Sequence, residues 1–267
     1  MKRTIKWMLY FILLFLVTST FVNSNVEAAE KKKKETFSLP KNVLSISKSN
    51  TFPNTSEDME IIEPNEETKE LLSSISITIE NPELIQLMND TTIKPTPFAF
   101  GYRANIYLGR WPLHYRSEST TVNWDYQHIN LNEVNNLGGE KTEEARYIQN
   151  DKASVRGALT NKIAQPGTIK KLILHASKEK TRLPLSFSAV VGDNTKLNNY
   201  YNVPTKKKGE LNAYIPAINE KGQVVFGEVY VQLKGSNKEL KIKNVTKQSI
   251  GAWIPIQDHV SLDFQLK

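Results

Sequence analysis

The sequence predicts a mainly β fold with a minor α+β character: an antiparallel, β-sandwich-like body with a few short peripheral helices. Three observations predict it. Short runs with an apolar residue at every second position recur along the chain, as half-buried strands require. Pro and Gly, 12 of each in 267 residues, recur between these runs. No long helical period and no internal repeat interrupts the pattern, so a layered β architecture follows. Residues 57–267 are expected to form one β-rich domain, with a subdivision near residue 151 as the alternative.

The N-terminus has the pattern of an export signal. A positively charged start at residues 2–6 precedes an apolar run at residues 7–17. Val26 and Ala28 then provide the small residues that signal peptidase requires. The apolar run is shorter than the ~20 residues that span a bilayer, so we expect residues 1–28 to be removed after Ala28. An uncleaved membrane anchor is the alternative. The protein would then be extracellular, or associated with the cell wall or membrane.

Residues 29–56 read as a flexible polar lead-in, in which "LPKNVLSIS" can add one strand to the body. Two short helices are expected next. Asn65 or Pro64 can open the first, and Asn81 can cap the second with Pro82 at its first position. Residues 74–80, "SISITIE", lie between them and alternate as a strand. A further helix is expected within residues 138–152.

The second half of the chain is dominated by expected strands. Residues 170–177 and 184–192 are two of them. Residues 224–245 read as a hairpin with its loop around Gly235, Ser236 and Asn237. The final segment, "HVSLDFQLK", places Val260, Leu262, Phe264 and Leu266 inward and the residues between them outward.

The stretch "FGYRANIYLGRWPLHYRSESTTVNWDYQH" (100–128) combines aromatic and basic residues. A period of two predicts half-buried strands before and after its centre, with Ile106, Leu108, Trp124 and Tyr126 in the core. Between them, Gly109 and Pro112 predict a turn or irregular edge. Such a loop could stack on sugar rings while arginine holds an anion, or form a hydrophobic lid pinned by tryptophan. The candidate ligand-binding residues here are Arg110, Trp111, His114, Tyr115 and Arg116.

Charge is distributed unevenly along the chain. Residues 152–267 hold 19 Lys and Arg against 8 Asp and Glu, whereas residues 29–151 hold 13 against 19. Lys206, Lys207 and Lys208 are therefore further candidate ligand-binding residues, with a solvated loop as the alternative. Outside a Gram-positive cell, which the composition favours, the available anions are teichoic polymers and lipid head groups. Nucleic acid is not an expected partner.

Several stretches carry a family resemblance. "FGYRANIYLGRWPL", "VNWDYQ", "VYVQLKG", "GAWIPIQDH" and "LSISKSNTFPN" are similar to the YfkD-like family of Bacillus and relatives. The similarity runs along essentially the whole mature chain, in the same order and with the same leading signal. It implies an exported single-unit protein and carries no catalytic residue.

No motif assigns catalytic chemistry. The four His are scattered and the chain has no Cys, so neither a metal site nor a thiol nucleophile is predicted. Glu118 and Asp125 fall on opposite faces of an unbroken strand, which separates them as a carboxylate pair. No catalytic residue, metal or cofactor is assigned.

We therefore expect an exported cell-envelope protein that binds or associates structurally with anionic envelope components. The alternative is an envelope enzyme acting on peptidoglycan or teichoic acid. A third interpretation is an assembly factor whose partner is another envelope protein.

Overall fold

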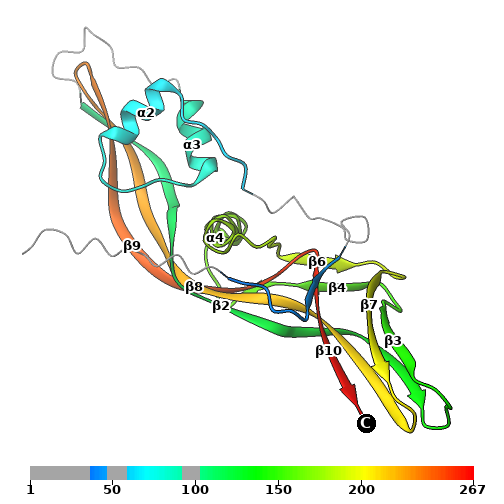
Figure 1. Cartoon of the computed structure of the whole chain (residues 1–267). Helices are drawn as coiled ribbons and strands as arrows, with labels where there is room; N and C mark the ends of the chain where they lie inside the picture. The colour runs from blue at the N-terminus through cyan, green and yellow to red at the C-terminus, as the bar shows by residue number, and fades with distance from the viewer. Residues whose placement is uncertain (1–36, 47–58, 92–102) are drawn as a thin grey trace, which may run out of the picture. The chain divides into compact units, whose positions relative to one another are not determined.

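The computed structural model describes residues 37–46, 59–91 and 103–267, and it confirms a mainly β, antiparallel fold with few helices (Figure 1). The predicted signal, residues 1–28, lies outside the described residues, as does most of the polar lead-in. The elements in chain order are β1 (Val43–Ser45), α2 (Glu66–Ser73), α3 (Pro82–Asn89), β2 (Arg103–Asn136), β3 (Glu143–Ile148), β4 (Ala153–Arg156), β5 (Ala158–Leu159), α4 (Pro166–Thr181), β6 (Ser188–Val191), β7 (Lys196–Val203), β8 (Lys207–Lys234), β9 (Asn237–Pro255) and β10 (His259–Leu266).

Strand β8 organises the main sheet. It pairs with β2 along its whole length on one side, and with β10 and then β9 on the other. The sheet order is β1-β10-β8-β9-β5, with β2 paired to β8, and two small sheets, β3-β7 and β4-β6, complete the β structure. The β8–β9 hairpin confirms the expected one, and Gly235 adopts the left-handed conformation in its turn (φ 58°).

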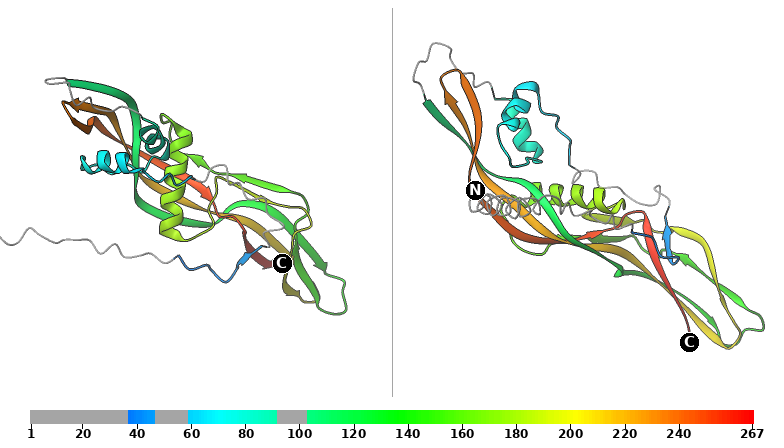
Figure 2. Two further views of the ribbon diagram at one scale, coloured as in Figure 1. Left: turned by 90° about the horizontal axis from the view of Figure 1, so that it is seen from above. Right: turned by 60° about the vertical axis from the view of Figure 1, so that its left-hand side comes forward.

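Different layers cover different parts of β8. Near its start, Leu211, Ala213 and Ile215 pack with the two small sheets. In the middle, residues 218, 224 and 226 pack with α4, which runs across the long strands in Figure 2. Near its end, residues 229, 231 and 233 pack with α2 and α3. Since side chains alternate between the faces of a strand, the even-numbered residues at both ends of β8 remain uncovered by these layers.

Both predicted helix caps are confirmed. The side chain of Asn65 accepts a hydrogen bond from the Thr68 amide (2.8 Å), which satisfies one of the free N–H groups of α2. Asn81 caps α3 in the same way, and Pro82 follows at the first helical position. The Asn81 side chain also donates to the Pro112 carbonyl (2.8 Å), so this cap ties α3 to β2.

Residues 170–177 form part of helix α4, so the expected strand there is wrong. The buried residues Ile169, Leu172, Ile173 and Ser177 follow the three- and four-residue spacing of a helix. Pro166 stands in its first turn, where its missing N–H costs nothing. A window beginning at Lys170 shows only the apolar run Leu172–Leu174, which does not separate a helix from a buried strand.

Two other expected elements also differ, and the expected C-terminal strand is confirmed as β10 with Val260 and Leu262 buried but with a different facing at two positions. Residues 143–148 form strand β3 rather than a helix, because Ala145 and Tyr147 alternate into the core. Residues 74–80 form no strand; instead the Glu80 amide donates to the Leu113 carbonyl (2.8 Å). In β10, Ser261 is fully buried and Leu266 is exposed, because β10 is covered on both faces near its start and on neither at its end.

Candidate functional site

Gly109 and Pro112 lie within the continuous strand β2, so the predicted turn is wrong, whereas its alternative, an irregular edge, matches the structure: β2 pairs with β8 alone among the described strands. Gly109 has φ of 116° and sits at a bulge where the register shifts between Tyr107 and Gly109. A second shift lies between Pro112 and His114. Strand β8 stays paired with β2 on both sides of Gly109 and Pro112. The two bulges accommodate the glycine and the proline, so the strand does not end there.

Three of the candidate residues make contacts with the rest of the fold. Trp111 packs with the cluster under α2 and α3, and its Nε1 donates to the Leu108 carbonyl (2.9 Å). The Tyr115 hydroxyl is buried and donates to the Glu220 carboxylate (3.1 Å); burial, followed by the charge of Glu220, raises the pKa of Tyr115. Nδ1 of His114 lies 2.9 Å from the Thr78 carbonyl. These contacts hold the three side chains against the rest of the fold, and none of the three belongs to the exposed surface described next.

The outward face of β2, β8 and β9 gathers a different set of side chains. Residues directly opposite each other in antiparallel strands project to the same face. The register pairs Tyr107 with Tyr230, and Tyr230 with Lys241. We call this surface the aromatic–cationic face; its residues are Arg103, Asn105, Tyr107, Arg110, Glu228, Tyr230, Gln232, Lys234, Glu239, Lys241 and Lys243.

Two tyrosines form the centre of the aromatic–cationic face. The rings of Tyr107 and Tyr230 lie 5.0 Å apart at 39°, and Tyr107 is 53% exposed. Nζ of Lys243 lies 5.0 Å from the centroid of the Tyr230 ring, in cation–π contact. The Tyr230 hydroxyl donates to Glu228 (3.0 Å), and this hydrogen bond raises the pKa of Tyr230. The pair is therefore held in place while one ring stays open to solvent.

The charge of this face is positive. It carries three Lys and two Arg against two Glu. Glu239 pairs with Lys241 (2.8 Å), which lowers the pKa of Glu239. Arg110 donates to the Asn244 carbonyl (3.3 Å) and to Thr246 Oγ1 (2.6 Å), and within the described residues its charge has no carboxylate partner. In the same part of the chain, Arg103 and Lys243 make no ion pair either. An anion placed beside the tyrosines would therefore meet uncompensated cations.

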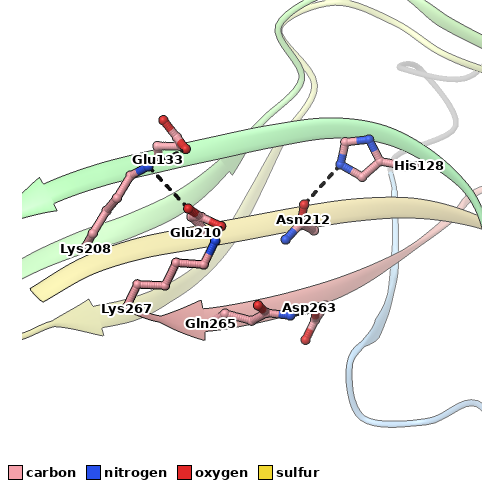
Figure 3. Close-up of polar contacts among 8 residues, drawn as sticks. All are labelled: His128, Glu133, Lys208, Glu210, Asn212, Asp263, Gln265 and Lys267. Atoms are coloured by element: carbon pink, nitrogen blue, oxygen red, sulfur yellow. Dashed lines mark hydrogen bonds and ion pairs between the residues drawn. The ribbon is translucent and has the colours of Figure 1, made fainter.

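The other predicted lysines have a different environment. Lys206 occupies the turn before β8 (φ 62°), and Lys207 opens the strand. Lys208 lies between Glu133 (2.8 Å) and Glu210 (3.2 Å), and Glu210 also pairs with Lys267 (2.5 Å) (Figure 3). Hydrogen bonds to both glutamates raise the pKa of Lys208. Its charge is thus neutralised within the sheet, and the candidate face does not include it.

Arg116 and the candidate acids are also separated from this face. Arg116 is exposed and pairs in register with Gln223, while Asp125 accepts a hydrogen bond from Ser261 (3.1 Å). Glu118 lies near Tyr115, where its charge contributes to the raised pKa of that hydroxyl. Among the described residues, no group of three or more His, Asp and Glu is arranged to hold a metal ion.

Sequence reasoning missed Tyr107, Tyr230 and Lys243. The signal was available for Tyr107: the alternation that places Ile106 and Leu108 inward leaves Tyr107 outward. Its pairing with Tyr230 depends on the register of two strands more than 100 positions apart, which no local pattern provides.

Comparison with known proteins identifies the family of this chain. A family model described as "YfkD-like protein" matches residues 40–267. The chain belongs to the YfkD-like family. A relative, "Uncharacterized protein YfkD" of Bacillus subtilis (strain 168), is 48% identical over 233 residues, covering 87% of this chain and 88% of the relative. No solved structure matches this YfkD-like chain. In the part of the chain described, no helix has the length and apolar character needed to cross a membrane.

Proposed function

We propose that this YfkD-like protein is exported to the cell envelope and binds a phosphate-bearing wall polymer, without catalysis, through the aromatic–cationic face. The observation that carries the proposal is the Tyr107–Tyr230 pair, with Tyr107 exposed, beside cations that, in the described part of the chain, have no carboxylate partner. Arginine and lysine bind phosphate through charge-assisted hydrogen bonds. The tyrosine rings offer an apolar surface to the carbon skeleton between successive phosphates.

A linear polymer fits this face better than a single lipid head group. Side chains on the same face of a strand recur every ~6.8 Å, since each residue rises ~3.4 Å. Arg103 and Arg110 lie near opposite ends of the face on β2, and Lys241 and Lys243 lie beside each other on β9. The cations thus form rows along the strands, and a chain of phosphates can contact several of them at once. A head group would contact only one part of the face.

Cosedimentation of the purified protein with purified cell wall tests the proposal. We expect binding to intact wall and its loss when the anionic polymer has been extracted. The affinity of the double variant Arg110→Gln, Lys243→Gln for the wall should be lower than that of the wild type by a factor of about ten or more. Lys208→Gln removes the same type of charge from a position already paired with glutamates, so it should bind like the wild type. Equal binding to extracted wall, or stronger binding to anionic vesicles than to wall, would contradict the proposal.

A further inference from the structure

The pairing of β2 with β8 is interrupted opposite a proline, away from the aromatic–cationic face. Asn123 pairs with Ala217 and Gln127 with Ile215, so residues 124–126 of β2 stand opposite Pro216 alone. Proline has no N–H to donate to the ladder, and it is tolerated within a sheet at bulges. Pro216 thus stands at the point where β2 bulges, and its carbonyl accepts a hydrogen bond from the Ile256 amide (2.8 Å) on the other side of β8. Bulges of this type redirect side chains and are common beside functional sites.

The bulge borders an open groove. The space between residues 126–129 of β2 and strand β4 has a volume of about 410 Å³. Its lining includes Tyr126, Gln127, His128, Ser154 and Arg156. We call it the Pro216 groove. Its volume is in the range of small-molecule sites.

One wall of the Pro216 groove is a fixed aromatic ring. Tyr126 stacks on Trp253 with centroids 5.0 Å apart and planes at 20°. Trp253 belongs to β9 and pairs in register with Asn219 on β8 and with Ala158 on β5. This pairing on both sides fixes the backbone of Trp253 and therefore the position of the stack. The flat surface is thus present before any ligand binds, which lowers the ordering cost of binding.

The polar groups of the groove are arranged for an anion. Arg156 is exposed, and its side chain makes no hydrogen bond or ion pair within the described residues. Nε2 of His128 lies 3.1 Å from Asn212 Oδ1, and its ring rests edge-on against Tyr214 with centroids 5.2 Å apart. In the described part of the chain, no acidic side chain lines the groove. A guanidinium without a partner binds carboxylate or phosphate through two parallel hydrogen bonds.

We propose that the Pro216 groove binds a single sugar unit that carries a carboxylate or a phosphate. The sugar ring lies on Tyr126, and Arg156 holds the anionic group, with Gln127 and Ser154 available to the hydroxyls. The aromatic stack selects the ring, the arginine selects the charge, and neither feature belongs to the aromatic–cationic face. The inference therefore stands apart from the proposed wall binding and can fail without it.

Titration of the purified protein with glucose, glucuronate, glucose 1-phosphate and inorganic phosphate tests the inference. Tryptophan fluorescence reports on Trp253 together with Trp111 and Trp124, and calorimetry provides an independent affinity. We expect saturable binding of glucuronate or glucose 1-phosphate. The affinities for glucose and for inorganic phosphate should be lower by a factor of about ten or more. The two charged sugars distinguish a carboxylate ligand from a phosphate ligand.

Variants test the arginine and the aromatic ring of the groove one at a time. Arg156→Gln should weaken binding of the charged sugar about tenfold without changing the unfolding midpoint, because the side chain is exposed. Tyr126→Phe should retain binding, whereas Tyr126→Leu should lose it. Arg110→Gln with Lys243→Gln should leave sugar binding unchanged while weakening wall binding. The inference is overturned if no charged sugar saturates the protein, if Arg156→Gln binds like the wild type, or if inorganic phosphate binds as well as the sugar phosphate.

Discussion

Tyr107 and Tyr230 face each other across β2 and β8 with ring centroids 5.0 Å apart, on the side of the sheet that α2 and α3 do not cover. Their neighbours Ile106 and Val231 form the next register pair and project to the covered side. One pair of strands thus contributes to the core with one set of residues and forms the aromatic–cationic face with the other.

Substitutions at two neighbouring positions in β2 should therefore affect different properties, one the stability of the fold and the other the binding to cell wall. Ile106→Ala should lower the free energy of unfolding by about 2 kcal/mol, because it removes apolar contacts with the α2–α3 cluster. Tyr107→Ala should leave the unfolding midpoint nearly unchanged and weaken binding to cell wall. Urea denaturation and cosedimentation measure the two effects. A Tyr107→Ala variant that unfolds early and binds normally would show that the ring belongs to the core.

The buried carboxylate of Glu220 makes a second prediction. It is fully buried and accepts hydrogen bonds from the hydroxyls of Tyr115 and Thr120. Tyr115→Phe removes one donor and should cost about 1–3 kcal/mol of stability in urea denaturation at neutral pH. Tyr107→Phe removes the hydroxyl of an exposed ring and should cost less than about 0.5 kcal/mol. Equal stability of the two variants would mean that Glu220 does not depend on Tyr115.

Alkaline pH should destabilise the protein through its buried tyrosines. Burial raises the pKa of Tyr115 and of Tyr147 above the ordinary value. The folded state therefore holds these protons when the unfolded chain, with a tyrosine pKa of about 10, has begun to release them. The stabilisation is present below pH ~10 and is lost as the pH rises further. The urea midpoint of the wild-type protein should fall as the pH rises from about 8 to about 11. The midpoint of the double variant Tyr115→Phe, Tyr147→Phe should fall less, when each protein is compared with its own value at pH 8.

Two adjacent glycines should tolerate alanine differently. A Cβ at Gly139 would overlap the side chain of Asn136, which is fully buried and donates to the Lys141 carbonyl (2.9 Å) and the Val203 carbonyl (2.8 Å). Since Asn136 cannot move without losing these bonds, Gly139→Ala should lower the free energy of unfolding by about 1–3 kcal/mol. A Cβ at Gly138 meets open space, so Gly138→Ala is the matched control. Equal midpoints for both variants in thermal denaturation would contradict the predicted overlap.

Export itself has a direct test. If residues 1–28 are a cleaved signal, N-terminal sequencing of the protein recovered from the envelope fraction should begin at Ala29. A protein that begins at Met1 and stays with the membrane would indicate the anchor, and one recovered from cytosol would contradict export.

Local patterns were sufficient where one side chain decides the structure. Asn65 and Asn81 predicted the starts of α2 and α3 because an amide oxygen can satisfy the free N–H groups of a helix. The β8–β9 turn followed from Gly235 for a similar reason. These signals act within a few residues and need no partner strand.

Long-range pairing decided the rest. Gly109 and Pro112 are local signals for a break, but β8 continues past them and bulges accommodate both. The candidate face depends on the same register, which brings Lys243 beside a tyrosine pair that no window of sequence contains. Helix α4 was missed for a different reason: its apolar run is short, and only the wider spacing from Ile169 to Ser177 reveals the helical period.

The salt dependence of wall binding tests the central claim most directly. Binding of the wild-type protein and of the variant Arg110→Gln, Lys243→Gln to purified wall should be measured over a series of ionic strengths, with Lys208→Gln as the control. Exposed charges are screened over ~10 Å at 0.1 M salt, so wild-type and Lys208→Gln affinities should fall steeply together as salt is added. The double variant should start weaker and fall less. Affinities that do not change with salt, or that are the same for all three proteins, would contradict binding through the aromatic–cationic face.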